Sequence, residues 1–182
     1  MKIFQKALMA SEDVKALLVS GKYLKDNVAA EIEDGSVVAI GDLMDNTAYT
    51  GRKDHNIRKV TAPAATTDDI GFVDLAEISQ GDIMGNIYKI GYKTAGLTAP
   101  AGTPVRVRRP MVGDTFYLGE ANFDKVPAIG EVGLVTAGAT TLTVAADAAG
   151  HTGIYVVVED IESLTQGTVA GDHIYFCRVK RA

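Results

Sequence analysis

The side chains that most often carry catalysis or bind metals are few in this chain and lie far apart in the sequence. The histidines are His55, beside Asp54 in a polar stretch, His151, in a glycine-flanked turn, and His173. A loop histidine beside an aspartate can act as an acid–base group or a metal ligand, but no second ligand stands at a useful spacing. We therefore interpret His55 as a solvated loop residue and His151 as a turn residue.

The single cysteine, Cys177, excludes an internal disulfide and any metal site built from several cysteines. His173 precedes Cys177 by four residues, and on a strand this spacing places the two on one face about 13 Å apart. That separation is too long for a shared metal ion or a thiolate–imidazole pair. We therefore predict that Cys177 is a buried, small apolar side chain.

Two acidic pairs, Asp42 with Asp45 and Asp68 with Asp69, offer the oxygen ligands that calcium prefers. The spacing of a calcium-binding loop is missing, so we expect these carboxylates to cap turns. The glycines of VPAIGEVGLV lack the spacing of a nucleotide-binding loop, and the chain has no Walker A, GxSxG, HExxH or CxxC motif. We predict no enzyme, with no catalytic, cofactor-binding or metal-binding residue and no cofactor.

The basic residues concentrate in the segment VRVRRP, where strand alternation places Arg106 and Arg108 on one face. The 182 residues include 18 Lys and Arg against 23 Asp and Glu, a formal net charge of −5, which disfavours nucleic acid as a partner. We therefore predict that Arg106 and Arg108 face an acidic protein surface, with a plain solvated strand face as the alternative. Met111, just beyond them, is expected in the core.

The elements that must position these residues are mostly strands. Hydrophobic residues make up 47% of the chain and charged residues 23%, which is typical of a folded protein. Many β-branched residues and scattered glycines favour an all-β barrel or sandwich of roughly ten short strands. No apolar run approaches the roughly 18–20 residues that span a bilayer, and the first residues lack the apolar centre of a signal peptide. We expect no membrane partner.

The first 25 residues are predicted to form an N-terminal arm and one short helix. Ser11 can cap that helix, apolar residues from Val14 to Leu18 follow helical spacing, and Gly21 offers a stop. In the arm, the apolar side chains are those of Ile3, Phe4 and Leu8.

Residues 26–182 are predicted to form the β-rich domain, with a candidate subdomain break near 94–104. Asp34 and Gly35 should turn a hairpin between strands at 27–33 and 36–43. We expect an exposed loop over 44–56 and a strand at 86–94. In the last strand, alternation places Ile174 and Phe176 on one face, with Tyr175, Cys177 and Val179 on the other.

Four segments with β-rich turn patterns follow one another along the chain, before a closing valine-rich strand pair: VSGKYLKDNVAAEIEDGSVVAIGDL, VTAPAATTDDIGFVDLAE, GDTFYLGEANFDKVPAIGEVGLV and TTLTVAA. This arrangement resembles that of the capsid decoration, or cement, proteins encoded beside the major capsid protein in tailed phages. The resemblance implies a β-rich protein that is made in the host cytoplasm, binds the outer face of the virion capsid and clamps neighbouring capsomers.

The same resemblance implies the major capsid protein as partner and self-association around local symmetry axes, a trimer included. An apolar arm on a β domain can add to a partner's sheet edge or groove, so Ile3, Phe4 and Leu8 are predicted interface residues, together with Arg106 and Arg108. The alternative function is that of a phage tail or fibre component, or another receptor-binding β module.

Overall fold

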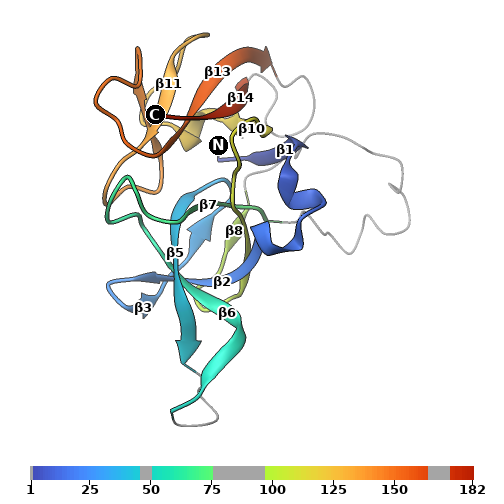
Figure 1. Ribbon diagram of the computed structural model, residues 1–182, viewed down its shortest axis with the longest axis vertical. Coiled ribbons are helices and arrows are strands. Elements are labelled where there is room, and N and C mark those ends of the chain that lie inside the picture. Colours follow the sequence, from blue (N-terminus) through green and yellow to red (C-terminus); the bar gives the residue numbers. More distant parts are fainter. Residues whose placement is uncertain (1, 46–50, 76–96, 164–172) are drawn as a thin grey trace.

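The computed structural model describes residues 2–45, 51–75, 97–163 and 173–182, and within these ranges the chain is built from strands. The predicted all-β class is therefore confirmed. Helical structure in the described residues is limited to three 3-10 turns, η1 (Ala10–Glu12), η2 (Lys15–Leu17) and η3 (Glu120–Asn122). Figure 1 shows the strands in two groups stacked along the long axis of the molecule.

Five strands close into a small barrel: β2 (Leu18–Lys25), β5 (Val37–Asp45), β6 (Lys53–Thr61), β7 (Ile70–Val73) and β9 (Val105–Arg108). Strand β2 pairs with β6 in parallel and with β9 antiparallel, so the hydrogen-bonded order β2-β6-β5-β7-β9 returns to β2. Closure satisfies the backbone groups that an open sheet would leave along its two edges.

Branched aliphatic side chains fill the barrel interior, among them Val60 and Val107, both fully buried. Little space is left in the barrel interior beside these two valine side chains. A Cβ atom at Gly21 would lie 2.7 Å from Cγ1 of Val60, and one at Gly71 would lie 2.4 Å from Cγ1 of Val107. Glycine at both positions therefore lets the valines fill the centre of the barrel.

The second sheet has six strands in the order β1-β10-β14-β13-β11-β12. Their bounds are β1 (Phe4–Leu8), β10 (Thr115–Gly119), β14 (His173–Arg181), β13 (Ile154–Ser163), β11 (Val132–Val135) and β12 (Leu142–Ala145). The short strand β3 (Val28–Ala29) pairs with β2, and β4 (Ile32–Glu33) pairs with β8 (Thr98–Ala99).

A shared apolar core joins the second sheet to the barrel. Phe72 of β7 packs against Phe4 of β1 and Phe116 of β10, with ring centroids 5.8 and 4.9 Å away. The same core takes Tyr175 and Cys177 from β14, so the predicted alternation of the last strand is confirmed. Strand β7 faces both cores, because Phe72 points to the second sheet and the next residue, Val73, points into the barrel.

The N-terminal segment differs from the predicted free arm and helix. Residues 4–8 form the edge strand β1, which pairs antiparallel with β10, and Ile3 and Phe4 are only 2% and 0% exposed. The 3-10 turns η1 and η2 stand where the helix was expected, and Leu18 already belongs to β2. Ser11 does not cap a helix: it lies within η1, whose N-cap is Met9, and its hydroxyl accepts a hydrogen bond from Arg108. These residues turn the chain from the second sheet into the barrel.

The predicted hairpin at Asp34 and Gly35 is wrong in its pairing. A turn exists there, with Gly35 at φ +68°, but β4 before it pairs with β8 and β5 after it pairs with β6 and β7. The hairpin lies earlier, between β2 and β3. Asp26 and Asn27 at its tip have φ values of 52° and 63°, the left-handed pair that a tight hairpin turn requires.

Both ends of the loop predicted over 44–56 belong to strands, because β5 continues to Asp45 and β6 begins at Lys53. The two strands project beyond the barrel as a ribbon (Figure 1). Residues 46–50 and the strand expected at 86–94 lie outside the described residues. The described part of the segment 94–104 contains β8.

Candidate interaction surface

Two buried polar side chains hold the N-terminal strand in place. The Asp34 carboxylate accepts hydrogen bonds from the backbone N–H groups of Phe4 and Leu75, both at 2.8 Å. Oδ1 of Asn122 accepts from the N–H of Ile3 at 2.9 Å, and Nδ2 of Asn122 donates to the carbonyl oxygen of Asp34 at 3.2 Å. Ile3 and Phe4 therefore belong to the core of this chain, which is at odds with the interface role predicted for them.

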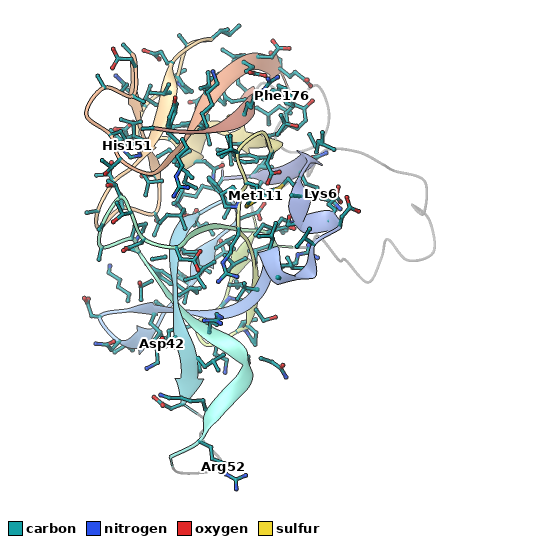
Figure 2. The ribbon with its side chains drawn as sticks, viewed as in Figure 1. Lys6, Asp42, Arg52, Met111, His151 and Phe176 are labelled. Carbon is teal, nitrogen blue, oxygen red and sulfur yellow. The ribbon has the colours of Figure 1, made fainter. Side chains whose placement is uncertain are left out.

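Leu8, at the other end of β1, is 72% exposed. We call the exposed apolar side chains of two hydrogen-bonded segments, 8–18 and 109–115, the apolar strip: Leu8, Val14, Leu18, Met111 and Val112. Figure 2 shows Met111 beside the segment of β1 that carries Lys6. An interface role for Leu8 stays a prediction.

The backbone under the apolar strip is fixed by one buried carboxylate. Oδ1 of Asp114 accepts from the N–H of Ala10, and Oδ2 accepts from the N–H of Met111, both at 2.9 Å. These bonds join the η1 turn to the turn that carries Met111 and Val112. Leu8 lies opposite Thr115 in the β1–β10 ladder, directly after that turn. The strip is thus assembled from segments about a hundred residues apart in the chain.

The placement of Met111 in the core was wrong, and no prediction was made for Val112. Met111 is 48% exposed and Val112 is 62% exposed. The available signal was the turn chemistry around them, because Pro110 precedes the pair and Gly113, at φ +98°, follows it. Val14 and Leu18 were assigned to the apolar face of a helix that the chain does not form.

The arginines of β9 share one face as predicted, and they converge on Asp74. Nε of Arg108 donates to Oδ2 of Asp74 at 2.6 Å, and Nη1 donates to the Ser11 hydroxyl at 3.0 Å. Nη2 of Arg106 lies 3.0 Å from the same Asp74 oxygen. Arg108 is 4% exposed, so its expected contact with a partner surface is wrong. Arg106 keeps a 41% exposed side chain, and its contact with a partner stays a prediction.

The acidic pairs bind protein groups. The Asp68 carboxylate caps a turn by accepting from the N–H groups of Ala64 and Ala65, at 2.8 and 3.0 Å, as predicted. Asp69 instead receives two hydrogen bonds from the Arg109 guanidinium, from Nε and Nη2. Asp45 pairs with lysines of β6, and hydrogen bonding from Lys53 lowers the pKa of its carboxyl. Turn capping was therefore wrong for Asp69 and Asp45.

The remaining reactive side chains are separated from one another. Nε2 of His151 lies 3.1 Å from the carbonyl oxygen of Ile154, and Nδ1 of His173 lies 4.0 Å from the Glu120 carboxylate. His55 belongs to β6 and not to a loop. Cys177 is fully buried as predicted, and this burial raises the pKa of its thiol. Within the described ranges, no three His, Cys, Asp or Glu side chains gather as a metal site.

Comparisons with known proteins complete the description of the chain. No family model, no curated protein and no solved structure matches it. In the part of the chain that the structure describes, no helix has the length and apolarity to cross a bilayer.

Proposed function

We propose that this protein is a capsid decoration protein, which binds the outer face of a tailed-phage shell and clamps neighbouring capsomers. The observation that carries the proposal is the apolar strip of Leu8, Val14, Leu18, Met111 and Val112. Exposed apolar side chains that gather on joined segments mark interaction sites on soluble proteins. The order of turn-rich segments in the sequence, which resembles that of cement proteins, directs the proposal to the major capsid protein as the partner.

The backbone that carries the apolar strip is held in place, which favours docking. This backbone is fixed by the β1–β10 ladder and by the Asp114 hydrogen bonds, so docking would order few new residues and lose little conformational entropy. Many identical copies on one shell would add up, because multivalent contacts turn modest affinities into strong attachment. Self-association of copies around a local symmetry axis, in a trimer for example, would bring several strips to one site on the virion exterior.

Co-sedimentation with purified heads that lack the protein tests this proposal. Leu8→Asp and Val112→Asp place a charge on the apolar strip without touching the core, and both should weaken binding to heads at least about tenfold. Val28→Asp and Val126→Asp are matched controls, since Val28 and Val126 are 68% and 62% exposed and lie outside the strip. Both controls should bind like the unaltered protein.

Two results would overturn the proposal in different ways. Failure of the unaltered protein to sediment with heads removes the capsid as partner and favours the receptor-binding alternative. If the strip variants and the control variants lose binding equally, or if neither set loses binding, the apolar strip is not the docking face.

A further inference from the structure

A polar cleft lies away from the apolar strip, where the N-terminus meets the β2–β3 hairpin and β4. Its volume is about 530 Å³, within the range of small-molecule sites. No residue of the apolar strip lines it. The polar lining consists of Lys2, Tyr23, Lys25, Glu31, Glu33, Ser36 and the threonines of β8 and of the turn before β12, and the apolar residues Ala30 and Ile32 complete it.

Ser36 is the unusual residue of this cleft. It is completely buried, and its hydroxyl is the one buried side-chain nitrogen or oxygen of the described residues that has no hydrogen-bond partner. Its backbone is satisfied, because its N–H donates to the Glu33 carbonyl at 3.3 Å and its carbonyl accepts from the N–H of Val73 at 3.0 Å. A buried hydroxyl without a partner destabilises a fold. A ligand with hydroxyl groups in the adjoining cleft would supply that partner through a rotation about the Cα–Cβ bond.

The charged groups of the cleft cancel. Nζ of Lys2 lies 2.9 Å from the Glu33 carboxylate, and the Lys2 side chain is only 12% exposed. Lys25 and Glu31 add one further positive and one further negative charge. The cleft therefore offers no net field to an ion, while its ammonium, carboxylate and hydroxyl groups supply hydrogen-bond donors and acceptors close together.

We infer that this cleft is a binding site for a neutral polyhydroxylated ligand, a saccharide. Each sugar hydroxyl both donates and accepts, which matches a lining of mixed donors and acceptors with no net charge. The inference does not depend on capsid binding, because the cleft and the apolar strip have no residue in common.

Titration of the isotope-labelled protein with glucose, galactose and N-acetylglucosamine, followed by amide chemical shifts, tests the inference. At least one sugar should shift amides of the cleft lining with a millimolar dissociation constant. Ser36→Ala should weaken that binding about fivefold while stability stays equal or rises, since no protein group bonds to the hydroxyl. Ser20→Ala, on exposed β2 surface, is the matched control and should bind normally.

Glycine betaine serves as a comparison, because it is polar and has no hydroxyl groups. Shifts absent with all three sugars, or equally large with glycine betaine, overturn the inference. Sugar binding that Ser36→Ala and Glu31→Gln both leave unchanged also overturns it, since the bound sugar then lies elsewhere.

Discussion

At Arg108, one buried guanidinium ties β9 to Asp74 and to the turn that holds Ser11. Arg108→Met removes the buried one of two arginine partners of Asp74, whose carboxylate stays in a site that is 6% exposed. We expect a loss of about 3–5 kcal/mol in the free energy of unfolding, as for other broken buried pairs. Urea unfolding followed by circular dichroism measures it.

Arg106→Met is the control, because Arg106 contacts the same oxygen of Asp74 from a half-exposed position. Solvent screens that pair, so its removal should cost at most about 1 kcal/mol. Equal losses in the two variants would show that burial of Arg108 does not set the strength of this cluster.

The thiol of Cys177 makes stability depend on alkaline pH. Burial, with a smaller effect of Glu159, raises the pKa of the thiol above its usual value of 9.0. Above that pH the unfolded chain releases the proton and the folded chain keeps it. The free energy of unfolding should therefore fall as pH rises, by at most about 1.4 kcal/mol per pH unit. It should be constant with respect to this group below that range.

Cys177→Val removes this contribution at nearly constant volume. Tyr23 and Tyr175 also have pKa values raised by burial, but both proteins contain them, so the difference between the two proteins reports the thiol. Above pH 9.0 the urea midpoint of the unaltered protein should fall more steeply with pH than that of Cys177→Val. A parallel pH dependence in both proteins would contradict the assignment.

Among the elements, β1 contains both an anchor and an exposed end. Phe4 is fully buried against Phe72 and Phe116, whereas Leu8 in the same strand is 72% exposed. Phe4→Ala should lower the free energy of unfolding by about 3–5 kcal/mol. Leu8→Ala should change it by less than about 0.5 kcal/mol. Chemical denaturation of both variants gives the comparison, and a folded, fully stable Phe4→Ala protein would contradict the placement of β1 in the core.

Patterns within a single strand were predictable, and pairing between distant strands was not. Alternation correctly divided the faces of the last strand and placed Cys177 in the core. Asp34 and Gly35 correctly marked a turn, but the partner of β4 is β8, which lies far along the chain. The N-terminal segment shows little pattern because its ladder with β10 shifts register between Lys6 and Leu8. Its anchors, Asp34 and Asn122, lie in other segments of the chain.

The candidate surface could be predicted only in part for the same reason. Leu8 was predicted as an interface residue from its place in an apolar segment, and the structure shows that it is exposed. Arg108 was misassigned because strand alternation gives the face of a residue and not what covers that face, and here Asp74 and Ser11 do. Met111 and Val112 join the strip through the Asp114 carboxylate, a contact that the order of residues does not disclose.

For the whole molecule, the closed barrel and the second sheet together form a frame that holds the apolar strip in one shape. Their shared aromatic core joins β1, β7 and β10, so the strip rests on both groups of strands. A ligand that binds only an assembled shell stabilises it by about 2.7 kcal/mol per site at a hundredfold excess over Kd. Repeated over a lattice, a modest affinity at each strip would be sufficient to stabilise the shell.

The most direct test of the decoration role is the thermal release of DNA from heads with and without this protein. Heads that lack it should release DNA at a lower temperature, and purified protein added back should restore the higher temperature. The Leu8→Asp variant should restore it less well than Val28→Asp. Equal release temperatures for bare and decorated heads would contradict the account.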